Sequence, residues 1–490
     1  MKKHEVLAVV LFLVGCLAFT GAEAFSAAPA IGPVTLVSGP SPFAQGCDGG
    51  PSLGFLNYHN YEVEPYVAVN PVDPLTIVVS WQQDRWQWGG ANGFAAAVTH
   101  DGGATWSRYA FPYLTVCSGG HSQRGGDPWL SFAPNGDLYH AGLMMDAYMV
   151  NSGVMISKSV DGGDTWSGPT TLDFRSTPNA IADKPSITAD PADSRYVYAA
   201  WAQNQFGSGV QPSYGPRGSS AYKMTSWFSR TTDGGQTWEP ARMIYDPGEH
   251  SYCLGHQIVV LPDGELLNVF HIQTDKKNAH GQRGLRLAIM RSADKGETWG
   301  GPAIVDTMEP VTIDDPTTGE MVFTGATLPD VAVDGGSGNV YLVWEDGRFS
   351  GGVRDGIAFS KSTDGGLTWS AAVKVNKASA AAFTPSVAVS ADGTIAVTYY
   401  DLRNDTSDPL ILQTDYWVVV SHDGGETWEE AHIAGPFDMR SAPEPGAPWY
   451  FVGDYVGLAA AGNSFITAFP MANFETPSNP TDIFVSTITP

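Results

Sequence analysis

A short phrase recurs six times in this chain and limits its fold more than any other feature. Residues 161–166 read Asp-Gly-Gly-Asp-Thr-Trp, and close copies begin at Asp101, Asp233, Asp294, Asp364 and Asp423. Each copy follows a β-type run and is followed by a second short apolar run. An aspartate at the start of a turn accepts hydrogen bonds from nearby backbone groups, and glycines allow positive φ. The phrase therefore predicts a hairpin turn, and its repetition predicts a repeat architecture.

These phrases resemble the Asp-box. The chain is similar to the bacterial Asp-box (BNR-repeat) sialidase-like propeller proteins along nearly all of its mature length. The resemblance implies a β-propeller in which the boxes lie on the face away from the ligand site. We therefore expect all six boxes to be structural, and the function has to be argued from other residues.

A second repeated phrase marks the strands that would line the centre of such a fold. It begins at Pro65, Pro128, Pro185, His256, Pro329, Pro385 and Asp454. The spacings, from 56 to 73 residues, leave room for four short strands each. The last unit lacks a fourth strand and an Asp-box, and residues 33–37 are a spare strand that would complete it. The sequence thus predicts an all-β, seven-bladed β-propeller closed by the N-terminal strand. The alternative is six blades, as in the better known sialidase domains, with an irregular C-terminal extension.

The N-terminus predicts export. A basic start, an apolar run over residues 6–19 and the small-x-small triplet Ala22-Glu23-Ala24 form a signal peptide, residues 1–24, ahead of one domain, residues 25–490. A lipoprotein cleavage site at Cys16 is the alternative. A formal charge of −25 argues against nucleic acid and anionic membrane partners. We expect a secreted, periplasmic or cell-surface monomer without a membrane span.

Three cysteines remain after removal of the signal peptide. An oxidising compartment permits one disulfide among them. Cys47 and Cys117 flank the first blade, and we expect this pair to bond, with Cys253 left over. Three unbonded thiols are the alternative.

Three blades carry similar polar phrases at the ends of their second strands. They hold Arg85 after Asp84, Arg348 after Asp346, and Arg403 after Asp401. If the boxes occupy one face, these ends lie on the other, where three arginines from neighbouring blades would converge on an anionic group of a substrate. In the alternative interpretation each aspartate holds its own arginine in the loop.

The sialidase resemblance implies an arginine triad, a tyrosine nucleophile and an acidic residue. The family's first arginine lies in an Arg-Ile-Pro phrase, where this chain has Val63-Glu64-Pro65, so that arginine is missing. Tyr455, at the start of the last inner strand, resembles the nucleophile in its placement. A tyrosine there is also a natural packing residue of the centre.

A broader glycosidase hypothesis needs two carboxyl groups across one sugar. The predicted functional face offers Glu64, Asp84, Asp127, Asp183, Glu345, Asp346, Asp401 and Asp454. We select Asp127 and Asp84 with Tyr455 as candidate catalytic residues. Glu64 and the three arginines are candidate substrate contacts. Trp86 and Trp88, in a glycine-rich loop, are candidates to stack on sugar rings. Trp129, Trp344 and Tyr400 are weaker candidates, with core packing preferred for Trp344.

No cofactor is expected, and no loop has a dedicated calcium spacing, although a structural calcium ion would suit the Asp-rich loops. Two main hypotheses follow for the same face. The first is a secreted glycoside hydrolase acting on a terminal, potentially acidic sugar. The second is a non-catalytic propeller that binds a glycan or a protein. A polysaccharide lyase is a third and weaker hypothesis.

Overall fold

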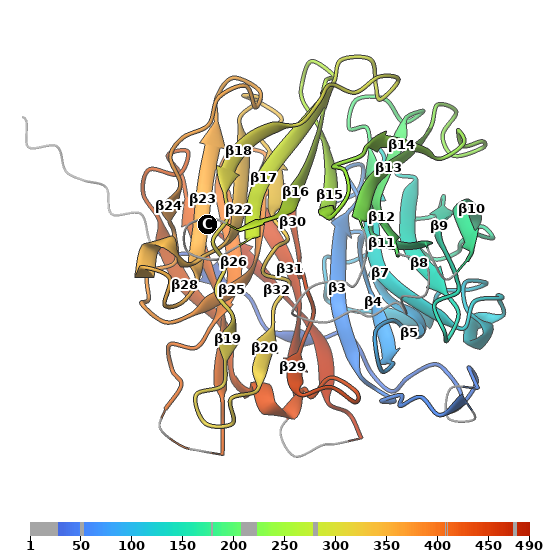
Figure 1. The fold of residues 1–490 in the computed structure, drawn as a ribbon, viewed down its shortest axis with the longest axis horizontal. Coiled ribbons are helices and arrows are strands. Elements are labelled where there is room, and N and C mark those ends of the chain that lie inside the picture. The colour runs from blue at the N-terminus through green and yellow to red at the C-terminus, as the bar shows by residue number, and fades with distance from the viewer. Residues whose placement is uncertain are drawn as a thin grey trace, which may run out of the picture.

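The computed structural model of the chain is built almost entirely of antiparallel β-strands (Figure 1). It describes residues 28–49, 53–177, 180–206, 223–277, 283–406, 408, 410–473 and 478–490. The predicted signal peptide and Cys16 lie outside these residues. Three 3₁₀ turns lie among the described residues: Val116–Ser118, Gly347–Ser350 and Met439–Ser441. None of the described helices has the length and apolar character needed to span a membrane.

Most of the described strands fall into seven successive repeat units, each an antiparallel meander, and a single pair between Ala91 and Gly125 joins units 1 and 2 into one sheet. Unit 1 contains β3 Glu62–Val69, β4 Ile77–Arg85, β5 Ala91–Thr99 and β6 Ser107–Ala110. Unit 2 contains β7 Arg124–Phe132, β8 Leu138–Met145, β9 Asn151–Ser159 and β10 Thr170–Ser176. Unit 3 contains β11 Ala180–Ala189, β12 Val197–Gln205, β13 Lys223–Thr231 and β14 Arg242–Tyr245. Unit 4 contains β15 Ser251–Val260, β16 Leu266–Lys277, β17 Arg283–Ser292 and β18 Ala303–Thr307.

The remaining units repeat the pattern. Unit 5 contains β21 Asp330–Val333, β22 Val340–Asp346, β23 Gly356–Ser362 and β24 Val373–Lys374. Unit 6 contains β25 Ala382–Val389, β26 Ile395–Asp401, β27 Gln413–Ser421 and β28 Glu429–Asp438. Unit 7 contains β30 Gly457–Ala461, β31 Ser464–Ala472 and β32 Thr481–Thr489. Residues 457–489 therefore form a regular sheet where the alternative expected an irregular extension.

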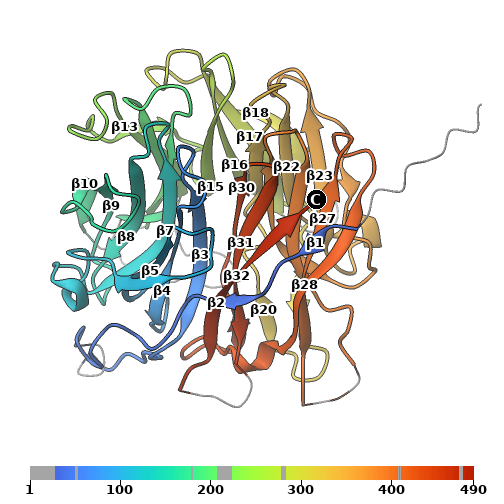
Figure 2. The same cartoon turned by 180° about the vertical axis from the view of Figure 1, so that it is seen from behind.

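The N-terminal segment adds to the last unit. β1 Ala30–Ile31 and β2 Thr35–Leu36 both pair antiparallel with β32, and Figure 2 shows them beside it. The expected pairing of the N-terminal strand with the C-terminal unit is thus present.

The hydrophobic core lies between neighbouring units, because each sheet has two apolar faces. Val78 and Phe94 of unit 1 pack with Leu130 and Leu138 of unit 2. Each unit contacts the next, and β3 of unit 1 also contacts β30 and β31 of unit 7. In that last interface Val67, Val79 and Trp81 share a core with Ile466 and Ile483.

Each Asp-box turn joins the third and fourth strands of its unit, as predicted. In the turn after β13, the Asp233 carboxylate accepts hydrogen bonds from the backbone N–H and the hydroxyl of Thr237, at 2.9 and 2.6 Å. The buried hydroxyl of Thr231 donates to Asp233 at 2.8 Å and accepts from the N–H of Gly235 at 2.9 Å. A Ser or Thr two residues before the aspartate makes the same contacts in the other five boxes.

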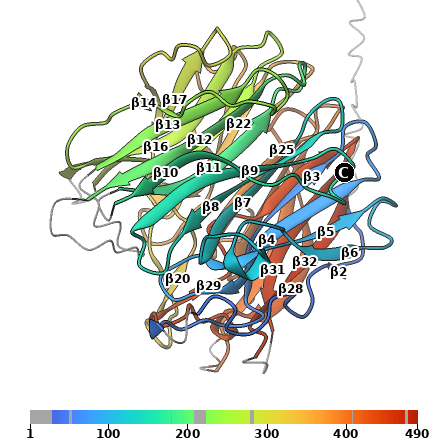
Figure 3. The ribbon, with the colours of Figure 1, turned by 90° about the vertical axis from the view of Figure 1, so that its right-hand side faces the viewer.

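Two insertions form a further small sheet outside the repeat units. β19 Ile313–Asp314 pairs with β20 Met321–Phe323, which pairs parallel with β29 Trp449–Phe451. β19 and β20 precede unit 5, and β29 precedes unit 7. The side view shows β20 and β29 lying together (Figure 3). We call this three-stranded element the cap sheet.

Candidate functional site

A cavity of about 440 Å³ lies between the cap sheet and the inner strands of units 1 to 4. Its lining includes a polar set and an apolar set of side chains, which we call the polar end and the apolar end. The polar end is lined by Glu64, Arg85, Asp127, Asp183, Lys184, Glu444 and Asp454. This volume falls within the range of about 300–1,000 Å³ that is common for small-molecule sites.

Repeated bulges in the inner strands carry the polar side chains. Glu64, Asp127 and Lys184 each precede a proline and have φ of 55°, 55° and 46°. The strand register shifts at each of these positions. A bulge redirects a side chain, and a non-glycine residue at positive φ costs about 1–3 kcal/mol that the surrounding fold must offset. Thr384 of unit 6 has the same conformation before Pro385, with a φ of 49°.

Lys184 joins the acidic groups of three units. Its ammonium lies 3.1 Å from Glu64, 3.0 Å from Asp127 and 2.5 Å from Asp454. Burial lowers the pKa of Lys184, but the surrounding carboxylates outweigh this effect and hold the pKa well above its usual value. The ammonium is therefore charged at neutral pH.

Burial raises the pKa of the acids, whereas it lowers the pKa of the lysine. It raises the pKa of Glu64 to about 8, against the opposing charge of Lys184. Gln82 donates a short hydrogen bond to the Glu64 carboxyl group. Burial likewise raises the pKa of Asp183 to about 7. At neutral pH the polar end thus holds a mostly protonated Glu64 and a partly protonated Asp183 beside a charged ammonium.

Arg85 is the predicted arginine that reaches the cavity. Its Nε donates to Glu444 at 3.2 Å, and its guanidinium also donates to Gln82 at 2.9 Å. Burial raises the pKa of Glu444 to about 7, although Arg85 opposes the shift. Both side chains are buried, so the pair is a fixed wall of the cavity.

The expected convergence of three arginines is wrong. Arg348 is bound to Asp346 and to Asp306, each at 2.8–2.9 Å. Arg403 is bound to Asp401 at 2.6 Å and to Glu430 at 2.5 Å. Neither arginine lines the cavity. The aspartate two residues earlier holds each one in its own loop, which was the alternative interpretation.

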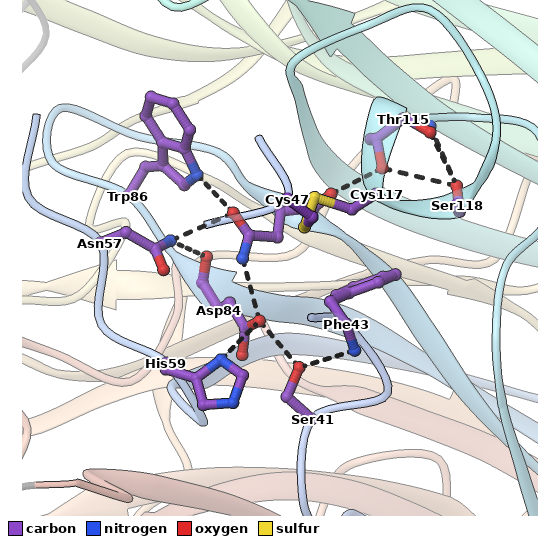
Figure 4. The surroundings of a disulfide bond; sticks show 11 residues. Ser41, Phe43, Cys47, Asn57, His59, Asp84, Trp86, Thr115, Cys117 and Ser118 are labelled. Carbon is purple, nitrogen blue, oxygen red and sulfur yellow. Dashed lines mark hydrogen bonds and ion pairs between the residues drawn. A yellow bond between two sulfur atoms is a disulfide. The ribbon is translucent and has the colours of Figure 1, made fainter. Parts of the chain in front are cut away.

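Asp84 and Trp86 also have structural roles (Figure 4). The buried Asp84 carboxylate accepts from Ser41 at 2.7 Å and from Asn92 at 3.0 Å, and it contacts His59 at 3.1 Å. Trp86 is fully buried and donates to Asn92 at 2.7 Å. Neither residue is available to a substrate, so both expectations are corrected.

A disulfide joins Cys47 to Cys117 close to this cluster. This is the pair expected from the sequence. It links the N-terminal segment to the connection between units 1 and 2. Cys253 is a buried free thiol whose sulfur lies 3.2 Å from the Ser226 hydroxyl.

Trp88 and Tyr455 differ in their access to the cavity. Trp88 lines it and is 45% exposed, so it remains a candidate contact. Tyr455 lies in a smaller neighbouring space, and its hydroxyl donates to the carbonyl of Pro128 at 3.3 Å. Burial raises the pKa of Tyr455 well above its usual value, and the charges of Glu64 and Asp127 add to the shift. This environment disfavours the phenolate that a tyrosine nucleophile requires.

The other aromatic candidates pack in the core or against it. Trp344 and Tyr400 are fully buried, and Trp129 stacks on Tyr66 with ring centroids 4.0 Å apart. None of the three lines the larger cavity.

Sequence reasoning missed Lys184 and Glu444. Lys184 occupies the position before proline that Glu64 and Asp127 hold in units 1 and 2, so an alignment of the inner-strand phrases could have found it. Glu444 lies in the insertion before unit 7, which has no repeat to mark it. Its contact with Arg85 spans 359 positions of sequence.

The described residues contain no group of three or more His, Cys, Asp or Glu side chains placed to hold a metal ion. In the acidic cluster the Lys184 ammonium takes the central position, where it contacts three carboxylates.

The repeated sheets, and six turns that share one hydrogen-bond pattern, define an all-β Asp-box repeat protein. Residues 220–444 match the family model described as a BNR repeat-like domain. This match supports the resemblance of the chain to the Asp-box (BNR-repeat) sialidase-like proteins. No curated protein matches the chain.

Several solved structures resemble it at low identity. A Hadza microbial sialidase is 17% identical, with a TM-score of 0.47, over 84% of this chain and 74% of the other. A Penicillium chrysogenum α-L-arabinanase is 14% identical, with a TM-score of 0.47, over 93% and 98%. A polysaccharide lyase of family 25, an ulvan lyase, is 14% identical, with a TM-score of 0.45, over 76% and 79%.

Proposed function

We propose that this protein is an exported glycoside hydrolase that acts on an uncharged sugar at the polar end of the cavity. The observation that carries the proposal is the pairing of Glu64 and Asp127. Their carboxyl oxygens lie 3.1 and 3.0 Å from the same Lys184 nitrogen, so they are at most about 6 Å apart. Glycosidases that retain anomeric configuration place their two carboxyl groups about 5–5.5 Å apart, and inverting enzymes about 6.5–9.5 Å apart.

The raised pKa of Glu64 assigns it the role of the acid, and Asp127 is its partner. Glu64, protonated at neutral pH, gives its proton to the glycosidic oxygen while the Asp127 carboxylate attacks the anomeric carbon. Water then hydrolyses the glycosyl ester, and Glu64 takes back the proton. Lys184 holds both side chains in position and donates to a sugar hydroxyl. Trp88 is the proposed stacking surface.

The charges of the cavity favour an uncharged sugar over the acidic one considered from the sequence. The basic side chains of its described lining residues are Arg85, Lys184 and His271. Arg85 is bound to Glu444, and Lys184 to three carboxylates. Burial lowers the pKa of His271 to about 4, so it is neutral. An anionic substituent would meet carboxylates without a free cation to balance it.

The proposal includes a monomeric, seven-bladed propeller, residues 25–490, exported by the signal peptide 1–24. The contacts of each repeat unit with the next, and of unit 7 with unit 1, support closure of the ring. The disulfide fits an oxidising compartment.

The test is a screen of fluorogenic exo-glycosides, with neutral sugars, sialosides and uronides in parallel. We expect turnover of a neutral glycoside, with kcat reduced about 10²–10⁴-fold in Glu64→Gln and Asp127→Asn. Asp263→Asn, an exposed acid in a turn far from the cavity lining, is the matched control. A better leaving group needs less protonation, so a dinitrophenyl glycoside should restore part of the Glu64→Gln rate and little of the Asp127→Asn rate.

The pH profile is a second readout. Because Glu64 acts in its protonated form, the rate should fall as pH rises through about 8. Activity confined to sialosides or uronides would overturn the preference for an uncharged sugar. Turnover that survives in both variants as in the control would overturn the assignment of the site.

A non-catalytic glycan-binding protein is the second candidate. The observation that favours it is the contact of the Lys184 ammonium with three carboxyl groups, which holds the acids together without any substrate. Binding of a neutral glycan that Trp88→Ala weakens, with no turnover of any glycoside, would support this candidate against the hydrolase.

A further inference from the structure

We propose that the substrate carries a flexible apolar group, an alkyl or aryl aglycone, that occupies the apolar end of the cavity. The inference rests on the proposed function, because it places the sugar at the polar end. It adds a class of aglycone that the acidic residues do not specify.

The apolar end is built by side chains from several separate segments. Met145 on β8, Met149, Met224 on β13 and Leu254 on β15 line it from the repeat units. Ile313, Met321, Val322, Phe323 and Trp449 line it from the cap sheet. The apolar end and the polar end are parts of one continuous cavity, so one ligand can contact both.

A sugar alone does not match this lining. Each hydroxyl placed against methionine and leucine side chains would lose hydrogen bonds to water and gain none in return, at a cost of about 1–3 kcal/mol. A hydrocarbon group in the same place is stabilised, because it leaves water for an apolar surface.

The methionines indicate a flexible or variable group. Four of the 12 methionines of the chain line this cavity: Met145, Met149, Met224 and Met321. Methionine side chains have three rotatable bonds and a polarisable sulfur, so they adapt to ligands of differing shape.

Beside its apolar residues the cavity lining also includes Tyr252, His271, Gln273, Thr312, Thr324 and Thr327. His271 Nδ1 donates a hydrogen bond to the carbonyl of Thr327 at 2.7 Å, so this ring nitrogen is not open to a ligand. Tyr252 and Gln273 are partly exposed. The Thr324 hydroxyl donates to Glu345 at 2.9 Å, so Thr324 and His271 each already have a partner within the protein.

The experiment measures binding without catalysis. The neutral fluorophore N-phenyl-1-naphthylamine is titrated into the protein and then displaced by methyl, butyl and octyl β-D-glucosides. The sugar is constant across this series, so the change in affinity with alkyl length reports on the alkyl group alone. We expect the dissociation constant to fall about fourfold per methylene until the chain fills the apolar end.

Variants locate the binding. Met224→Gln and Met145→Gln should weaken fluorophore binding about fivefold or more, because they place an amide in the apolar lining. Met321→Gln tests the apolar lining that the cap sheet contributes, and because Met321 is less buried the risk to folding is smaller. Met243→Gln is the matched control, since Met243 is 48% exposed on β14 and does not line the cavity. Thermal melting checks that each variant is folded.

Fluorophore displacement that does not depend on the length of the alkyl group would overturn the inference. Equal binding of the fluorophore by the folded cavity variants and by the Met243→Gln control would also overturn it. Failure of the hydrolysis screen is a separate result. It would remove the proposed activity and leave the binding measurement valid.

Discussion

Lys184 shows how a single side chain decides the chemistry of the candidate site. Three repeat units each place an acid within 3.1 Å of its ammonium. Acids packed this closely would repel one another if all were ionised, and burial increases the cost. The ammonium offsets part of that cost, while Glu64 remains easier to protonate than an exposed glutamate.

Glu64 should therefore make stability depend on pH. Its pKa in the folded protein is about 8, above the ordinary value. The stability linked to its proton is fully present below about pH 4.5 and is lost as pH rises through 8. We expect the free energy of unfolding of the wild type, relative to Glu64→Gln, to fall by about 2–4 kcal/mol between pH 5 and pH 8.5. Urea unfolding of both proteins at both pH values measures this difference, and parallel curves would contradict it.

At the scale of the element, the Asp-box turn depends on a residue outside the phrase that marks it. The Ser or Thr two positions before the aspartate connects the carboxylate to the glycine N–H across the turn. Hydrogen bonds from the hydroxyl and backbone N–H of Thr237 lower the pKa of Asp233 to about 2, so the carboxylate stays ionised in ordinary conditions.

Thr231→Val should destabilise this turn more than Thr237→Val. Thr231 is 1% exposed, and its loss leaves the Gly235 N–H without that partner, at a cost of about 1–2 kcal/mol. The Thr237 hydroxyl is solvent-accessible, so water can replace its bond. Urea unfolding at pH 7 compares the two variants, and an equal loss would show that the buried hydroxyl has no special role.

Local patterns account for what the sequence could predict. The Asp-box turns, the inner strands and the pairing of the last unit with the N-terminal strand follow from phrases of five to six residues and their spacing. The roles of Arg348 and Arg403 could not be predicted, because an Asp-x-Arg phrase fits both a loop contact and a substrate contact. The Arg85–Glu444 pair and the cap sheet depend on insertions that only the folded chain brings together. Trp86 could not be placed, because a glycine-rich loop does not reveal which of its side chains turns inward.

At the scale of the whole molecule, the two ends of the chain hold one sheet together. Val37 donates to the carbonyl of Ile483 at 2.9 Å, and the Ser38 hydroxyl donates to Asp482 at 3.0 Å. Without this segment β32 would be an exposed edge next to the core shared by units 7 and 1.

A chain that begins at residue 39 should be less stable than one that begins at residue 28. We expect its melting temperature to be lower by at least about 5 °C, with more aggregation on heating. Both chains retain Cys47 and Cys117, so the disulfide is constant. A synthetic peptide of residues 28–38 should restore part of the loss by strand addition. Equal restoration by a scrambled peptide would contradict specific pairing.

The inner-strand bulges allow the side chains of the site to be exchanged without a change of backbone. Units 1, 2, 3 and 6 present Glu64, Asp127, Lys184 and Thr384 from the same left-handed backbone position before a proline. The fold already offsets the backbone cost at each one, so an exchange of side chains there needs no new backbone. A designer could swap acid, base or hydroxyl among these positions and alter the preferred ligand of the protein while its sheets stay the same.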